Sequence, residues 1–183
     1  MAVAGIATLG FLHSRGWSVF AVAAGRPRGI TIAAIFATLF AIVVVPADLV
    51  LRFPRDMNVP PPQAFLFYPV MAYLVEITLH ACPLALVVLL FGPSRERLEP
   101  NRRLWLWLLF VSLIEPILQT RLSYSGRPFF WQEGFVAVHV FAFNIVQLYV
   151  FRRYDFVSMY LLRLVYYVYW HVIWGYLRLQ WLF

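Results

Sequence analysis

The sequence predicts an all-α protein, a polytopic integral membrane helical bundle of five or six spans. Of its 183 residues, 63% are hydrophobic and only 13% are charged, whereas a soluble domain is nearer half apolar and a quarter charged. The apolar residues form runs that reach the length of about 20 residues that a membrane-crossing helix needs. Open strands would leave backbone amides unpaired in lipid, so helices are the expected way to cross.

Five apolar runs are predicted to span the membrane. Segments rich in Pro, Gly and Arg separate them, and these residues end helices. No internal repeat is visible and the length leaves no room for a second domain, so we expect one membrane domain over residues 1–183. The predicted spans are residues 30–51, 64–92, 103–121, 129–151 and 156–180.

The first 24 residues form a weaker apolar segment. No positively charged region precedes it, as it would in a signal peptide, and the polar stretch from His13 to Gly16 interrupts it. We therefore assign residues 1–24 to the folded domain, either as a weak span or as a helix that lies in the membrane interface.

The arginines predict the orientation of the bundle. The net charge is +7, but the basic residues stand in short clusters between apolar runs, which indicates topology signals rather than a nucleic-acid site. Eight arginines fall on the side of the loops "GRPRG", "GPSRERLEPNRR" and "RRYD", and four fall on the other side. The first side is therefore expected to be cytoplasmic, and the expected location is the inner (plasma) membrane of a bacterium.

Several polar side chains are predicted to lie inside the spans. Ionisable groups in hydrocarbon are costly and usually face the interior of a bundle, where they find a partner. The plain interpretation is that they hydrogen-bond neighbouring helices together. These residues are Glu76, His80, Glu115, Gln119, His139, Asn144, Arg163 and His171.

Three of these residues lie at a similar depth below the same side of the membrane. At 1.5 Å per residue, Glu115 lies roughly 9 Å, His139 roughly 15 Å and His171 roughly 14 Å from that side. They belong to three different predicted helices, so we expect a carboxylate and two imidazoles to converge in the bundle interior.

The residues around these three resemble the motifs of a known family. The stretches "EPILQTR" (115–121), "FVAVH" (135–139) and "HVIWG" (171–175) look like the patterns E-E-x-x-x-R, F-x-x-x-H and H-x-x-x-N or H-x-x-x-D. These belong to the CAAX prenyl protease and bacteriocin-processing (CPBP, or Abi) family of intramembrane proteases. The order of the motifs, one per helix, and their spacing agree over about residues 103–180.

The chain also departs from the family pattern. Pro116 stands in place of the second Glu of the first motif, and Gln119 and Arg121 stand near the position of its Arg. Gly175 ends the last motif, where the family has Asn or Asp.

The resemblance implies a glutamate-type endopeptidase that cleaves a membrane-anchored peptide or a lipidated substrate. It implies Glu115 as the general base that activates a water, His139 as a group that stabilises the oxyanion or shares the water, and His171 as a further member of the cluster. A positioned carboxylate can take a proton from water, and a fixed imidazole can donate to an oxyanion. The supporting residues would be Gln119, Arg121, Phe135 and Asn144.

Membrane lipid is the expected partner in addition to the substrate, and no cofactor, metal or nucleic acid is implied. Aromatic residues crowd the last predicted helix. They fit an aromatic belt at the membrane interface, or a contact with another membrane protein.

Pro116 directly follows Glu115 and lacks a backbone N–H, so it is predicted to bend the helix. The bend could open a cavity for water at that depth. It could equally mark a site that has lost its chemistry.

A second group of residues supports an alternative function. Glu76 and His80 are four residues apart and share one helix face. With His139 and His171 they could bind a metal, or two histidines could hold a haem or a pigment; a local Glu76–His80 pair is the simpler interpretation. The alternative is a catalytically inactive relative that serves as a subunit, or as a haem-, pigment- or metal-holding component, of a larger membrane protein complex.

Overall fold

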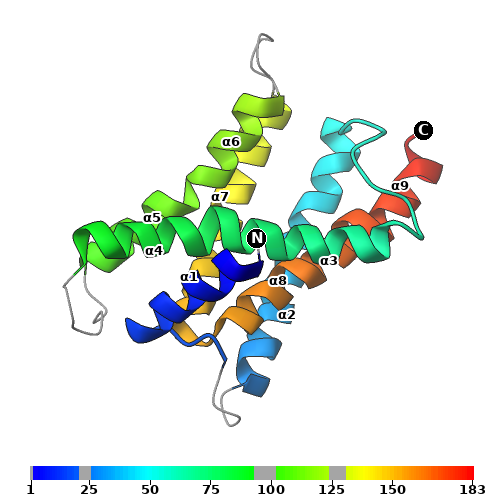
Figure 1. Cartoon of the computed structure of the whole chain (residues 1–183). Helices are drawn as coiled ribbons and strands as arrows, with labels where there is room; N and C mark the ends of the chain where they lie inside the picture. The colour runs from blue at the N-terminus through cyan, green and yellow to red at the C-terminus, as the bar shows by residue number, and fades with distance from the viewer. Residues whose placement is uncertain (1, 21–25, 93–101, 124–130) are drawn as a thin grey trace.

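The computed structural model describes residues 2–20, 26–92, 102–123 and 131–183, and these contain helices and no strand (Figure 1). The prediction of an all-α protein is therefore confirmed. The elements are α1 (Ala2–Ser14), α2 (Arg26–Leu51), α3 (Ala64–Val75), η1 (Glu76–Ala81), α4 (Cys82–Phe91), α5 (Arg102–Ser112), α6 (Ile114–Ser123), α7 (Trp131–Arg153), α8 (Phe156–Tyr167), η2 (Val168–Trp174) and α9 (Gly175–Trp181).

Five helical rods in the described chain are long and apolar enough to cross a membrane. Their ends differ from the predicted ones by three residues or fewer, and positions 129 and 130 of the fourth predicted run lie outside the described residues. The protein is an integral membrane protein. The rods are Pro27–Leu51, Ala64–Phe91, Arg102–Thr120, Trp131–Arg153 and Phe156–Trp181.

The helix α1 is too short to cross the membrane by itself. Its 13 residues span roughly 20 Å at 1.5 Å per residue, against a hydrocarbon core of about 30 Å. It packs along η1 and α4, where Thr8 Oγ1 lies 3.3 Å from Cys82 Sγ. The segment that follows α1 inserts Trp17 into the core.

The rod that starts at Arg102 is broken where Pro116 predicted a bend. Helix α5 ends at Ser112, α6 begins at Ile114, and a turn residue lies between them. Pro116 has no N–H to give to the carbonyl of Ser112, four residues earlier. That carbonyl instead accepts a hydrogen bond from Nδ2 of Asn144 on α7, at 3.2 Å.

Two rods contain a π-helical segment. The first, η1, ends just before Pro83, and the Cys82 N–H bonds to the carbonyl of Ile77, five residues earlier. The second, η2, ends at Trp174, just before Gly175. Such segments are rare and are frequently found at functional sites, and here they carry His80 and His171.

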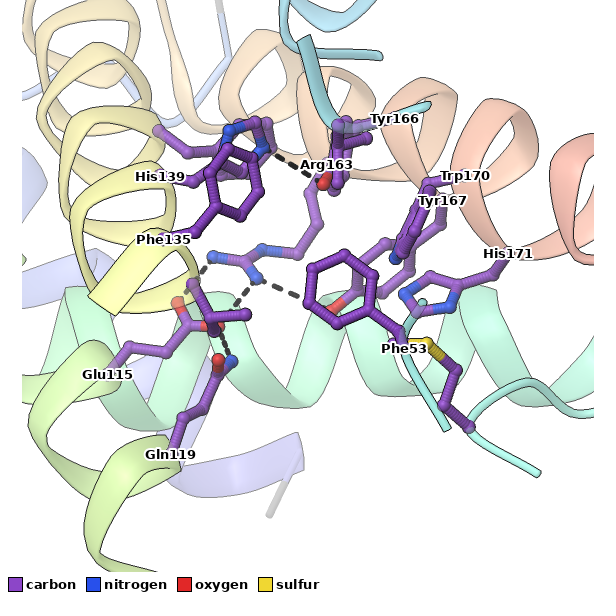
Figure 2. A pocket seen from close by; sticks show the side chains of 14 residues that line it. Phe53, Glu115, Gln119, Phe135, His139, Arg163, Tyr166, Tyr167, Trp170 and His171 are labelled. Carbon is purple, nitrogen blue, oxygen red and sulfur yellow. Dashed lines mark hydrogen bonds and ion pairs between the residues drawn. The ribbon is translucent and has the colours of Figure 1, made fainter. Parts of the chain in front are cut away.

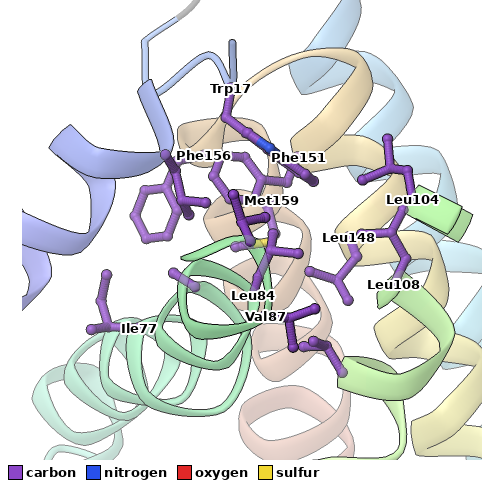
Figure 3. Packing of buried hydrophobic residues seen from close by; sticks show 14 residues of the cluster. Trp17, Ile77, Leu84, Val87, Leu104, Leu108, Leu148, Phe151, Phe156 and Met159 are labelled. Atoms are coloured by element: carbon purple, nitrogen blue, oxygen red, sulfur yellow. The ribbon is translucent and has the colours of Figure 1, made fainter. Parts of the chain in front are cut away.

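Two apolar clusters hold the described helices together, and α7 and α8 contribute to both. One packs α1, η1, α4, α5, α7 and α8 around Leu84, Leu148 and Met159 (Figure 3). The rings of Trp17 and Phe151 meet there with centroids 4.8 Å apart. The other cluster packs α2 against α7, α8 and η2.

A buried ion pair fastens the end of α2 to α9. Arg178 donates to both oxygens of Asp48, from Nε at 2.6 Å and from one terminal nitrogen at 2.9 Å, and both side chains are 0% exposed. Trp174 Nε1 also donates to Asp48, at 2.7 Å. The same guanidinium donates to the carbonyls of Phe53 and Pro54, so it fixes the start of the loop that follows α2.

Arg178→Met is expected to destabilise the protein by about 3–5 kcal/mol, because it leaves the Asp48 carboxylate buried without its counter-charge. Thermal or denaturant unfolding in detergent, followed by circular dichroism, measures the loss. Gln180→Met, at an exposed position of the same helix, is the control and should change stability by less than about 0.5 kcal/mol.

The double variant Asp48→Leu/Arg178→Met should recover much of the loss, because apolar replacement of a buried pair is often close to neutral. If the Arg178→Met protein were as stable as the parent, the Asp48–Arg178 ion pair would not contribute to the stability of the fold.

Candidate functional site

A cavity of about 240 Å³ lies inside the bundle, and the three residues with a predicted role in chemistry line it. Glu115 comes from α6, His139 from α7 and His171 from η2 (Figure 2). Gln119 and Phe135, two of the predicted supporting residues, line the same cavity. The expectation from depth alone, that three helices bring these groups to one interior space, agrees with this geometry.

Arg163 of α8 holds Glu115 in place. Its two terminal nitrogens donate to the two oxygens of the Glu115 carboxylate, at 3.0 and 2.8 Å. Its Nε donates to Oε1 of Glu76, at 2.5 Å. Gln119 Nε2 adds a bond to Glu115 Oε1 at 3.0 Å. One guanidinium thus joins carboxylates from η1 and α6, and it is only 2% exposed.

Polar side chains accept hydrogen bonds from the remaining N–H groups of the guanidinium. Arg163 donates to Gln147 Oε1 at 2.7 Å, to Asn144 Oδ1 at 3.3 Å and to the hydroxyl of Tyr167 at 3.3 Å. Gln147 Nε2 in turn donates to Glu76. All five donors of the guanidinium have acceptors. Asn144, predicted as a supporting residue, is therefore linked to Glu115 through Arg163.

His80 lies between the two carboxylates. Its Nδ1 is 3.2 Å from Oε2 of Glu76, and its Nε2 is 3.7 Å from Oε2 of Glu115. The expected Glu76–His80 pair is present, but it is not self-contained, because Arg163 and Gln147 also bind Glu76. We call Glu76, His80, Glu115 and Arg163 the central charge cluster.

His139 pairs with a hydroxyl on the neighbouring helix. Its Nε2 lies 3.1 Å from the Tyr166 hydroxyl, and its side chain is buried. The ring of Phe135, one turn earlier, stacks on the imidazole with centroids 5.3 Å apart, and Phe40 meets it edge-on. The ring of Phe135 therefore restricts the orientation of the imidazole.

His171 pairs with a loop residue. Its Nδ1 lies 2.6 Å from Oδ1 of Asn58, in the loop between α2 and α3. Its ring stacks on Tyr68, with centroids 4.7 Å apart and planes 15° from parallel. Gly175, one turn later, gives Asn58 its space, because a Cβ there would lie 3.0 Å from Asn58 Nδ2. Gly175 stands where the family pattern has Asn or Asp, and here a carboxamide from the loop fills the adjoining volume.

The four residues suggested as metal ligands do not come together as one set. The residues suggested as metal ligands are divided between the central charge cluster, Tyr166 and Asn58. Within the described ranges, no three His, Cys, Asp or Glu side chains lie close enough to hold a metal ion. The side chain of Arg121, a predicted supporting residue, lies outside the described part of the structure.

Several residues of this site were missed as site residues by the sequence analysis, among them Arg163, Gln147, Tyr166, Tyr167 and Asn58. Arg163 carried a usable signal, because an arginine in the middle of an apolar span needs a carboxylate partner, and Glu76 and Glu115 were candidates. Asn58 carried none. It lies in a Pro-rich loop, and only the packing of that loop on η2 brings it to His171.

The chain was compared with known proteins. No family model matches it, and no curated protein or solved structure matches it.

Arg163→Gln is expected to lower the stability of the bundle by about 3–5 kcal/mol, because Glu76 and Glu115 would lose their shared counter-charge in a buried site. Arg163→Lys should fall between this variant and the parent, since an ammonium keeps the charge but cannot form the two-pronged contact. Arg153→Gln, at an exposed position at the end of α7, is the matched control. Unfolding in detergent measures the order of stability of these variants. An Arg163→Gln protein as stable as Arg153→Gln would contradict the expected loss.

Proposed function

We propose that this cavity is the active site of a glutamate-type intramembrane endopeptidase that cleaves a membrane-anchored or lipidated peptide. We place the protein in the inner membrane of a bacterium. The observation that carries the proposal is that a carboxylate and two imidazoles, from three separate helices, line one cavity in a bundle of membrane-spanning length. The resemblance of the surrounding stretches to the three protease motifs points to the same residues.

Glu115 is the base in this proposal. A carboxylate has about four sites that accept hydrogen bonds, and the described contacts to Gln119 and Arg163 use three of them. His80 Nε2 lies 3.7 Å from Oε2, which is too far for a hydrogen bond, so one site on Oε2 is left for a water in the cavity. Because Arg163 holds both oxygens, the base is fixed in orientation before a substrate arrives, which favours reaction.

The proposed reaction is hydrolysis of a peptide bond. Glu115 takes a proton from the water as the water oxygen attacks the carbonyl carbon, and the carbonyl oxygen becomes an oxyanion. When the tetrahedral intermediate collapses, the C–N bond breaks, and Glu115 returns the proton to the leaving amine. The products are a carboxylic acid and an amine, so no other reactant is needed.

The oxyanion requires fixed hydrogen-bond donors. His139 and the hydroxyl of Tyr166 line the cavity and are bonded to each other at 3.1 Å. In this pair one group can donate into the cavity while the other holds it in place. Arg163 also lines the cavity and adds positive charge close by.

A second function is favoured by one observation: the residues of the site also hold the fold together. Arg163 ties η1 and α6 to α8 through buried ion pairs, as a purely structural cluster would. In this alternative the protein is a catalytically inactive subunit, or a haem- or pigment-holding component, of a larger membrane complex. An absorption spectrum of the purified protein separates the two, because a Soret or chlorophyll band would favour the alternative.

Glu115→Gln is expected to reduce cleavage by about 10²–10⁴-fold, because it keeps the shape of the base but removes the proton acceptor. The assay is cleavage of a membrane-anchored or lipidated peptide by protein in liposomes. Glu76→Gln is the matched control: it removes the other carboxylate from Arg163, but Glu76 is not among the residues that line the cavity. The two variants should lose similar stability, and Glu76→Gln should lose far less activity.

His139→Ala should also reduce cleavage, and combining it with Glu115→Gln should add little further loss, because groups that act as one unit are not additive. If Glu115→Gln cleaves as fast as the parent, the proposed mechanism is wrong. If no variant cleaves and Glu115→Gln loses a bound partner or pigment, the subunit function is correct.

A further inference from the structure

The contact between His171 and Asn58 determines which nitrogen of the imidazole carries the hydrogen. Asn58 presents its carboxamide oxygen to Nδ1 of His171 at 2.6 Å. A carboxamide oxygen only accepts hydrogen bonds, so Nδ1 must be the atom that bears the hydrogen. In a neutral imidazole the other nitrogen, Nε2, then has a lone pair and accepts.

The accepting nitrogen has no partner in the described protein. The one hydrogen bond found for His171 within the described ranges is the bond from Nδ1. The side chain lines the cavity together with Glu115 and His139. Nε2 of His171 is therefore a hydrogen-bond acceptor at the wall of the cavity, and a bound molecule can donate to it.

Several contacts keep Asn58 and His171 in this arrangement. The N–H of Val59 donates to the hydroxyl of Tyr68 at 2.8 Å, which anchors the loop beside Asn58. The ring of the same tyrosine stacks on His171, and Tyr167 meets the imidazole edge-on at 5.0 Å. Gly175 leaves the volume that the carboxamide fills. The loop and the imidazole are thus positioned by the same aromatic residue.

We propose that Asn58 is a positioning residue that fixes His171 as the Nδ1–H tautomer, so that Nε2 accepts a hydrogen bond from the molecule in the cavity. The donor is an N–H of a peptide backbone, or the O–H of water. This role deepens the proposed function and rests on it for the identity of the ligand. The oxyanion is then stabilised by the other side of the cavity, where His139, Tyr166 and Arg163 lie, and not by His171.

The protonation of His171 is measured by ¹⁵N NMR of the full-length protein with labelled histidine in detergent or nanodiscs. The spectrum is expected to show Nδ1 protonated and Nε2 unprotonated. Asn58→Leu removes the acceptor at similar size, and it should convert this signal into a mixture of tautomers. Asn58→Asp keeps an acceptor oxygen and should retain the Nδ1–H form. Asp56→Asn, an exposed change in the same loop, should leave the signal unaltered.

Gly175→Ala tests the same contact without changing either partner. Its Cβ would lie 3.0 Å from Asn58 Nδ2, so the carboxamide must shift by a few tenths of an ångström, and the share of the Nδ1–H form should fall, by less than in Asn58→Leu. This variant still decides the matter if Asn58→Leu does not fold.

In the cleavage assay, Asn58→Leu should reduce kcat by about 10–100-fold, the cost known for losing a group that orients a metal-binding imidazole, and Asn58→Asp should recover most of it. A neutral imidazole with the hydrogen on Nε2 in the parent protein would overturn the proposal, because the amide would then face Nδ1 of His171 with its nitrogen. An Nδ1–H parent that cleaves no peptide would refute the protease while leaving the tautomer assignment correct. Equal cleavage by Asn58→Leu and the parent would refute the positioning role.

Discussion

The guanidinium of Arg163 is the one charge on which the rest of the site depends. It lies in a rod of membrane-spanning length, where an unpaired charge is costly, and it is paired with Glu115 and Glu76 from two other rods. Removing either partner would leave charge buried and unbalanced. The ion pairs therefore fix how η1, α6 and α8 approach one another, and the same constraint orients the Glu115 carboxylate at the cavity wall.

Irregular backbone surrounds this charge. Pro116 breaks the rod between α5 and α6, and the carbonyl of Ser112 that it frees is taken by Asn144, which also accepts from Arg163. The segment η1, just before Pro83, presents Glu76 and His80 to the same cluster. In lipid, a freed backbone group must find a partner inside the protein. Helix defects and polar side chains therefore gather in one place, where the freed carbonyl of Ser112 finds a partner.

The cavity has walls of different chemical character. On one wall Glu115 is surrounded by donors, and on another His171 is bound to an acceptor and presents its free nitrogen as an acceptor. Between them, His139 and Tyr166 form a pair in which each group can donate or accept. Such a distribution suits a molecule that carries both a carbonyl and an N–H, as a peptide does. Because each of these side chains uses only some of its donors and acceptors within the protein, the same residues can stabilise the fold and leave lone pairs for a ligand.

The sequence by itself determined the helical class, the five rods, the bend at Pro116 and the positions of Glu115, His139 and His171 along their helices. Hydrophobic run length, proline chemistry and the rise per residue are local properties. It also required that Arg163 have a partner, but not which one. Helix rotation and loop packing decided the rest. They turned Glu76 from a local partner of His80 into a ligand of Arg163, gave His139 the hydroxyl of Tyr166, and brought Asn58 across more than a hundred residues to His171. Contacts between segments so distant in the chain depend on how whole helices pack, which no local pattern records.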